Sequence, residues 1–121
     1  MSRSVNKLIL VGNVGRDPEV RETRTGMKVA NLSLATNRRI QPPDEEEPDE
    51  RTDWHRLVFW NRLAQFAQDY IAQGDRIYVE GRLQYDSYER DGVEIPTAEV
   101  SVREVVLLSP RREDAEAVAA D

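Results

Sequence analysis

Residues 54–74 read WHRLVFWNRLAQFAQDYIAQG, a strand pattern followed directly by a helix pattern. Side chains alternate across a strand, so Leu57 and Phe59 fit a core face that His55 shares. The opposite face carries Trp54, Arg56, Val58 and Trp60. We therefore expect a half-buried strand that presents a tryptophan on each side of an arginine.

The helix pattern covers residues 61–73. Its apolar side chains recur at helical spacing, at Leu63, Phe66, Ala67, Tyr70 and Ile71. Asn61 is a candidate N-cap, and Gly74 is a typical C-terminal stop. One amphipathic helix therefore follows the strand.

Strand patterns also lie on both sides of this unit, over residues 6–14, 28–37, 76–88 and 97–108. In the first of these, residues 8–11 are all apolar, which requires burial on both faces of the strand. The last two are joined around Asp91-Gly92, a strong hairpin signal. Gly81 indicates a bulge or bend, and the apolar parity of the last strand changes near Glu104, as a bulge would cause.

This order of elements predicts an all-β fold: a five-stranded OB-fold barrel with one α-helix between the third and fourth strands and a long β-hairpin. SH3-like barrels lack so regular a helix. The chain of 121 residues has room for one such domain, which we place at residues 1–109. Within it, residues 38–52 combine prolines with acidic side chains and are expected to form a mobile loop. Residues 110–121 are expected to be a short acidic tail, disordered or forming a frayed helix.

The composition excludes the catalytic and metal-binding side chains on which most enzyme classes depend. The chain has no Cys and a single histidine, which rules out thiolate catalysis, Cys-built metal sites and multi-histidine sites. His55 lies on the core parity of its strand, where a hydrogen-bonded structural histidine is expected rather than a catalytic base. The acidic run after Ile40 lacks the spacing and turn glycine of a calcium loop. With no apolar run of membrane-spanning length and no signal peptide, we expect a cytoplasmic protein without metal, cofactor or enzymatic activity.

The formal net charge of -6 is distributed unevenly. Residues 1–39 carry eight basic and three acidic side chains, whereas residues 40–50 carry six acidic and no basic ones. A basic first third is suited to follow a phosphate backbone, although a solvated surface explains any single member more simply. The members that we consider for such contacts are Arg3, Lys7, Arg16, Arg21, Arg24, Arg38 and Arg39.

Two interpretations of the outward strand face stay open. In the first, Trp54 and Trp60 stack on bases while the Arg56 guanidinium meets phosphate. In the second, one or both rings complete a core or a subunit contact, because tryptophan is usually well buried. Tyr88, close to the hairpin turn, either extends the aromatic platform or simply packs.

Taken together, these segments resemble the bacterial single-stranded DNA-binding proteins. The matching segments are residues 5–13, 17–21, 29–31, 35–36, 54–56, 63–64, 78–81 and 99–100. Jointly they are highly specific, and the resemblance covers about residues 3–108. It implies an OB-fold that assembles as a homotetramer and wraps single-stranded DNA without sequence preference.

The resemblance also implies roles for individual residues. The family's stacking positions are matched by Trp54, Trp60 and Tyr88. Its basic contact positions are matched by Arg3, Lys7, Arg56 and Arg62. His55 matches a subunit contact, and the apolar strand adds Leu8 and Leu10 to the implied interface.

Two departures from the family pattern bear on function. Ile40 stands where many relatives have a tryptophan in the binding loop, and an acidic stretch follows it, so the contribution of that loop is in question. The chain also stops at Asp121 without the long linker and the acidic Pro-Phe tip by which relatives recruit replication and repair proteins. Either the sequence is shortened, or this form lacks that recruitment role.

We therefore expect a non-enzymatic, nucleoid-associated protein that coats and protects single-stranded DNA during replication, recombination and repair. One alternative is an OB-fold protein of a replication-restart complex that acts mainly through protein partners. Another is a nucleic-acid hydrolase on an OB scaffold, which would require a divalent metal.

Overall fold

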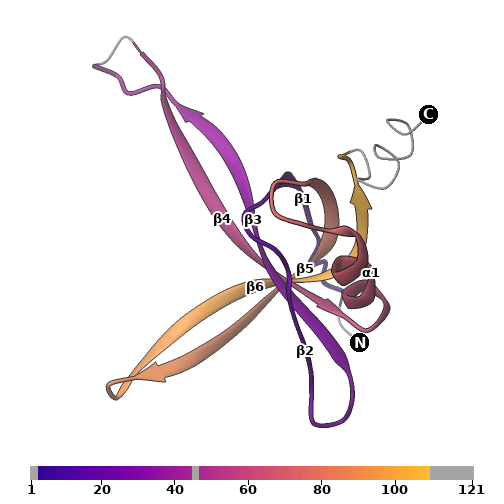
Figure 1. Cartoon of the computed structure of the whole chain (residues 1–121). Coiled ribbons are helices and arrows are strands. Elements are labelled where there is room, and N and C mark those ends of the chain that lie inside the picture. Colours follow the sequence, from indigo (N-terminus) through magenta and orange to yellow (C-terminus); the bar gives the residue numbers. More distant parts are fainter. Residues whose placement is uncertain (1–2, 45–46, 110–121) are drawn as a thin grey trace, which may run out of the picture.

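The computed structural model describes residues 3–44 and 47–109, which fold into strands and one helix (Figure 1). The elements in chain order are β1 (Leu8–Val14), β2 (Glu19–Glu22), β3 (Lys28–Ile40), β4 (Asp49–Trp60), α1 (Arg62–Tyr70), β5 (Arg76–Arg90) and β6 (Val93–Leu107). The tail expected at residues 110–121 lies outside the described residues.

Five of the strands close into a barrel. They are paired in the order β1-β5-β6-β4-β3, and a short β1–β3 ladder, Asn13 with Ala35 and Val14 with Leu34, closes the ring. All pairs are antiparallel except β4–β6, which is parallel. The predicted five-stranded OB-fold barrel is thus confirmed, and α1 lies between its third and fourth strands. The four-residue β2 adds an unpredicted strand beside β3, because its sequence EVRE has no apolar alternation to reveal it.

The core lies inside this barrel. Its largest fully buried side chains are Phe59, Leu34, Leu57, Ile77, Val29 and Val79. The core position predicted for Leu57 and Phe59 is therefore confirmed. The helix adds Ala64 and Ala67 to the core, and it ends at Tyr70 rather than residue 73, because Ile71 is already extended. Asn61 occupies the N-cap position, but its side chain makes no capping hydrogen bond.

The predicted irregularity in β5 and β6 is a β-bulge. The β5–β6 register shifts between Glu80 and Gly81, so that Glu80 pairs with Glu104 while Gly81 pairs with Val102. A side chain at Gly81 would collide with the carbonyl oxygen of Ser101 on β6, so only glycine fits at this position of the bulge.

Two long hairpins project from the barrel (Figure 1). In the β5–β6 hairpin, Arg90 pairs with Val93 around Asp91 and Gly92, whose φ angles of 51° and 78° confirm the predicted two-residue turn. The strand expected from residue 97 already begins at Val93, because this turn sets the register from its first residue.

The β3–β4 hairpin corrects the expectation of a loop over residues 38–52. The ladder continues to the pair Ile40 and Asp49, so only residues 41–48 connect the strands. Cross-strand contacts hold this part, including the ion pair of Arg38 with Asp53 at 2.9 Å. The acidic composition suggested disorder because a linear sequence does not show that Arg38 lies within ion-pair distance of Asp53 on the opposite strand.

Candidate nucleic-acid interface

The outer face of β4 carries the tryptophans that the strand pattern predicted. Trp54 is 61% exposed and Trp60 is 39% exposed, with Arg56 exposed on the same face. Val58 lies between them but is buried, because β3 and β6 flank β4 on both sides there. Six residues of strand separate the rings by about 20 Å, so the two rings are able to contact different nucleotides of one strand.

Trp54 packs against the backbone of Gly15, just beyond β1. A Cβ atom at Gly15 would lie 2.5 Å from Cζ3 of the Trp54 ring, so any side chain there would displace the indole. The Gly15 amide is itself fixed, because it donates a hydrogen bond to the Ser33 carbonyl at 2.9 Å. The ring is thus supported on one side and open to solvent on the other.

Arg56 lines a polar groove between β2 and the barrel. The groove has a volume of about 390 Å³, and its other charged lining residues are Arg16, Arg21, Glu19 and Glu99. Among the described residues, none of the three arginines lies within ion-pair distance of a carboxylate. Their guanidinium groups are therefore free to meet phosphate oxygens. Sequence reasoning grouped Arg16 and Arg21 only with the basic first third, because β2, which brings Arg21 to the groove, was not predicted.

Tyr88 lies on the same outer surface as Arg56. The strand registers connect them. Leu57 of β4 pairs with Val100 of β6, so the residues that precede this pair, Arg56 and Glu99, are also neighbours. Glu99 in turn pairs with Gln84 of β5. Tyr88 is four residues beyond Gln84 on β5, hence on the same face, and it is 49% exposed. The projecting hairpin therefore carries this ring away from the barrel, next to the turn.

The remaining predicted basic contacts are spread around the barrel. Arg62 is exposed at the first position of α1, two residues after Trp60, and Arg3 is exposed in the segment before β1. Lys7 is different, because its ammonium group forms an ion pair with Glu80 of β5 at 3.1 Å. The structure thus brings Arg56 together with the tryptophans, but Lys7 lies elsewhere, beside β5.

Acidic side chains surround Lys7. Glu80 and Glu104 face each other across the β5–β6 ladder, and a hydrogen bond with Glu80 together with its negative charge raises the pKa of Glu104. The hydrogen bonds from Glu104 and then from Lys7 lower the pKa of Glu80. Desolvation, followed by the hydrogen bond to Glu80, raises the pKa of Tyr78. Lys7 is therefore paired with Glu80, while its side chain stays 60% exposed.

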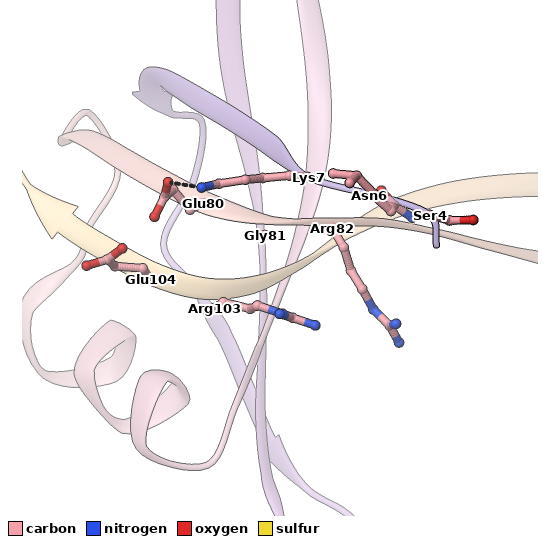
Figure 2. Close-up of a pocket in the computed structure, with 9 residues that line it drawn as sticks. Ser4, Asn6, Lys7, Glu80, Gly81, Arg82, Arg103 and Glu104 are labelled. Carbon is pink, nitrogen blue, oxygen red and sulfur yellow. Dashed lines mark ion pairs between the residues drawn. The ribbon is translucent and has the colours of Figure 1, made fainter. Parts of the chain in front are cut away.

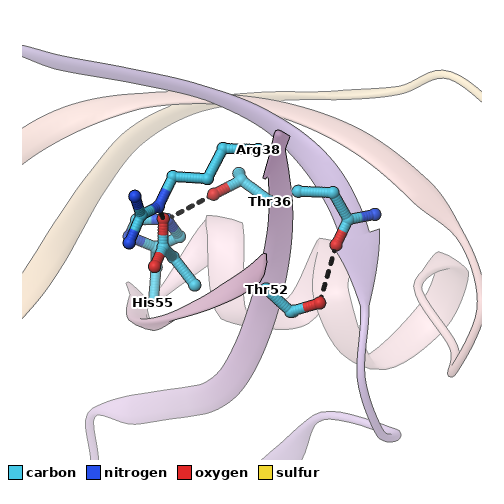
Figure 3. A network of polar contacts seen from close by, with 6 residues as sticks. Thr36, Arg38, Thr52 and His55 are labelled. Carbon is cyan, nitrogen blue, oxygen red and sulfur yellow. Dashed lines mark hydrogen bonds and ion pairs between the residues drawn. The ribbon is translucent and has the colours of Figure 1, made fainter. Parts of the chain in front are cut away.

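The residues expected at a subunit contact divide into two groups. His55 is half-buried, and its Nε2 atom is 2.8 Å from Oγ1 of Thr36 (Figure 3). Leu8 and Leu10 are half-buried too, but they pack against the barrel core. The apolar side chains that β1 turns outward are instead Ile9, 53% exposed, and Val11, 39% exposed.

Two further properties concern ligands and membranes. Within the described residues, no three His, Cys, Asp or Glu side chains gather as a metal site would require. The described part of the chain also has no helix of the length and apolarity needed to cross a membrane.

Comparison with known proteins identifies the family. Residues 5–108 match the Single-strand binding protein family. The chain belongs to this family. The family membership agrees with the OB-fold barrel and with the segments on which the sequence resemblance rests.

Named relatives place the chain within the family. It is 42% identical, over 93% of its length, to the Single-stranded DNA-binding protein of Xanthomonas campestris pv. campestris, and 38% identical, over 92%, to that of Xylella fastidiosa. The chain spans 66% of the Xanthomonas campestris protein and 63% of its counterpart from Xanthomonas axonopodis pv. citri. A solved structure described as a Plasmodium falciparum SSB complex with ssDNA superimposes with a TM-score of 0.82 at 29% identity, covering 90% of this chain and 99% of that one.

Proposed function

We propose that this family member binds single-stranded DNA without sequence preference and protects it during replication, recombination and repair, in the cytoplasm at the nucleoid. The observation that carries this proposal is the outer face of β4, where two exposed tryptophans flank Arg56, which has no carboxylate partner within the described part of the chain. The names of the relatives and the ssDNA complex of the structural neighbour support it.

The proposed mechanism is sequestration. Bases stack on Trp54 and Trp60, while the arginines of the groove neutralise phosphates of the same strand. Stacking is tolerant of sequence because every base has a π-face, and contacts to phosphates carry no sequence information. A stacked and neutralised strand is unable to pair with itself, so bound DNA loses its secondary structure. No covalent bond is formed or broken, so we propose a binding protein rather than an enzyme.

The direct test is a titration with oligo-dT of stepped length. Tryptophan fluorescence should be quenched on binding, and the affinity should rise with length and fall steeply with salt. Double-stranded DNA of the same length serves as the control ligand. Quenching and affinity equal for the two ligands, or no binding of oligo-dT at low salt, would contradict the proposal.

We further propose that the protein acts as a homotetramer. β3 pairs with β1 only at Asn13 and Val14, and among the described residues no other strand pairs with the edge of residues 8–11 that faces away from β5. Such an edge is a template for a second strand. The outward side chains of this strand are Ile9 and Val11, so these residues, rather than Leu8 and Leu10, carry the proposed contact. Sedimentation as a monomer at micromolar concentration would contradict it.

A further inference from the structure

A pair of carboxyl groups lies on the outer face of the barrel, where β1, β5 and β6 run side by side. Glu80 of β5 faces Glu104 of β6 across the ladder, and Ile9 of β1 lies beside Glu80 on the other side. Figure 2 shows the Lys7 ammonium group reaching Glu80, with Glu104 on the neighbouring strand. The two carboxyl groups therefore meet within the face to which Ile9 belongs.

Exposed apolar side chains flank the carboxyl pair on both outer strands. Ile9 and Val11 turn outward from β1, and Val106 of β6 is 45% exposed. Tyr78 of β5 lies between them, since it pairs with Val11 on one side and with Val106 on the other. Ile9 and Val11 carry the subunit contact proposed above. A second copy that covers the apolar side chains of both β1 and β6 also covers the carboxyl pair.

The β-bulge is what brings Glu104 onto this face. Val102 is buried in the core and Val105 packs against it, so two residues lie between them instead of one. Arg103 and Glu104 are both exposed as a result. The extra residue places Glu104, rather than an apolar side chain, opposite Glu80.

Two charged groups act on Glu104 most directly. The hydrogen bond with Glu80 and its negative charge raise the pKa of Glu104, and the positive charge of Lys7 lowers it by a smaller effect. Tyr78 also faces the pair, as a hydroxyl that hydrogen-bonds to Glu80. Within the described residues, no charge from β4 or α1 adds to these effects. Protonation of Glu104 is therefore governed by the carboxyl pair itself.

The cations of this face leave one carboxyl group without a partner. Lys7 pairs with Glu80 at 3.1 Å, and no other ion pair between described residues involves Glu80 or Glu104. The side chains of Arg82 and Arg103 extend away from both carboxyl groups (Figure 2). One positive charge thus serves two carboxyl groups, and their full ionisation leaves an uncompensated negative charge.

Covering this face with a second copy removes water from the carboxyl pair. An ionised carboxylate without a partner is costly to bury, so burial favours its protonated form. Two carboxyl groups that share one proton are hydrogen-bonded and carry a single negative charge, which Lys7 neutralises. The covered pair consequently holds its proton more firmly than the same pair on a separate subunit.

We propose that Glu80 and Glu104 form a pH-sensitive switch in the contact with a second copy of this chain, and that the assembly is tightest while the pair shares a proton. The proposal rests on the homotetramer proposed above and adds its regulation. The sign follows from linkage: the assembled form keeps the proton to a higher pH than separate subunits do. The association constant therefore falls as the pH rises above 4.5, the usual pKa of the Glu104 carboxyl, through the raised values.

The test measures the dissociation constant of the assembly between pH 5 and pH 8 at fixed ionic strength, by sedimentation velocity over a dilution series. The constant of the unaltered protein should rise with pH, by up to about tenfold per pH unit for each proton that dissociation releases. Glu104→Gln keeps a hydrogen-bond donor towards Glu80 but has no proton to lose. Its constant should depend less on pH, and at pH 8 it should be lower than that of the unaltered protein.

Glu89→Gln is the matched control. Glu89 also faces a glutamate, Glu94, across β5 and β6, but it lies in the projecting hairpin beyond the part of β5 that pairs with β1. This variant should follow the unaltered protein at every pH. His55 and the other titratable groups are common to all three proteins, so the comparison isolates Glu104. If the assembly does not dissociate on dilution, Val11→Ala in all three proteins removes part of the apolar contact and brings dissociation into range.

The outcomes separate this proposal from those on which it rests. A Glu104→Gln protein with the pH dependence of Glu89→Gln would overturn the switch and leave the homotetramer intact. An unaltered assembly that tightens as the pH rises would also overturn it, because ionised carboxylates would then be meeting cations of the second copy. A monomer at every pH would overturn the homotetramer and the switch together. Binding of oligo-dT, measured in parallel, tests the DNA-binding function separately, and circular dichroism shows that each variant is folded.

Discussion

At the scale of single residues, the candidate interface depends on how each ring or charge is supported. The tryptophan at position 54 rests on a glycine backbone, Arg56 lies in a groove with two other arginines, and Lys7 is held by Glu80. These environments differ, although the sequence presented all three side chains alike as candidate DNA contacts. Substitutions at this scale therefore separate DNA contact from structural support.

Replacing either tryptophan should weaken DNA binding. Trp54→Ala and Trp60→Ala are each expected to cost about 1 to 3 kcal/mol of affinity for oligo-dT, the range known for aromatic stacking in OB-fold single-strand binders. Trp54→Phe and Trp60→Phe are the controls, since a phenyl ring still stacks. Fluorescence or anisotropy titration measures the effect, and if both alanine variants bind as tightly as the unaltered protein, the rings are structural.

Gly15→Ala should act through Trp54. The added methyl group would lie 2.5 Å from the indole, so the ring must move, and affinity should fall part of the way towards that of Trp54→Ala. The backbone of Gly15 is not in the left-handed region, so alanine is permitted there and the effect reports the ring. In a double-mutant cycle on oligo-dT affinity, Gly15→Ala should have little effect in the Trp54→Ala background. Full additivity of the two losses would count against this coupling.

Glu104→Gln should stabilise the protein near neutral pH. The pKa of Glu104 in the folded protein is raised above its usual value of 4.5. The folded state therefore loses stability relative to the unfolded state as the pH rises from 4.5 through the folded-state pKa, because the ionised carboxylate is disfavoured in the fold. Glutamine still donates to Glu80 but carries no charge. We expect a higher thermal midpoint than the unaltered protein at pH 7 and no difference near pH 4. Glu22→Gln, on exposed β2, is the control, and a lower midpoint for Glu104→Gln at pH 7 would contradict this account.

At the scale of elements, the sequence predicted what short-range patterns specify. A continuous apolar run identified the first barrel strand, alternation identified the others with a change of parity near Glu104, and Asp91-Gly92 identified a turn. The prediction was incomplete where order comes from a distant partner: β2 forms because it pairs with β3, and the hairpin around Ile40 extends because cross-strand pairs hold it.

The acidic connection of the β3–β4 hairpin should weaken DNA binding at low salt. Glu50 and Trp54 lie on one face of β4, so Glu50 faces the side of the proposed track, and residues 44–47 lie just before this strand in the sequence. Changing residues 44–47 from DEEE to NQQQ keeps the length and removes four charges. Affinity for oligo-dT should increase below 50 mM salt and change less at high salt, because the Debye length shortens.

The unaltered and amide-substituted proteins should also have the same unfolding midpoint, which controls for changes in the hairpin itself. Equal affinities at all salt concentrations would show that this connection points away from the DNA.

At the scale of the whole molecule, a net charge of -6 coexists with a surface suited to an anionic ligand. Six of the 23 carboxylates lie within residues 40–50, and Glu80 and Asp53 form ion pairs with Lys7 and Arg38. The groove arginines Arg16, Arg21 and Arg56 have no ion-pair partner among the described residues. Total charge is therefore a poor guide to the ligand of this protein. The assembly that we propose likewise depends on one face of β1 rather than on overall composition.

Two substitutions on neighbouring residues of β1 should distinguish assembly from folding. Ile9 faces outward, so Ile9→Glu should leave a folded protein that sediments as a smaller species. Leu10 packs against the core, so Leu10→Glu should unfold the chain or lower its thermal midpoint sharply. Sedimentation velocity and circular dichroism provide the measurements. A tetramer that survives Ile9→Glu would place the subunit contact on another surface.

The barrel is closed at β1 and β3 by only two residue pairs, Asn13 with Ala35 and Val14 with Leu34. Every other barrel ladder except the parallel β4–β6 pair is longer, so local opening of the native state is expected to begin at this seam. The Trp54 ring lies against Gly15, the next residue after the seam. A base stacked on that ring would stabilise the closed pairing of β1 with β3. DNA binding therefore disfavours local opening of the barrel at this place. The amide hydrogens of β1 and β3 near the seam should exchange more slowly in the DNA-bound protein than in the free protein.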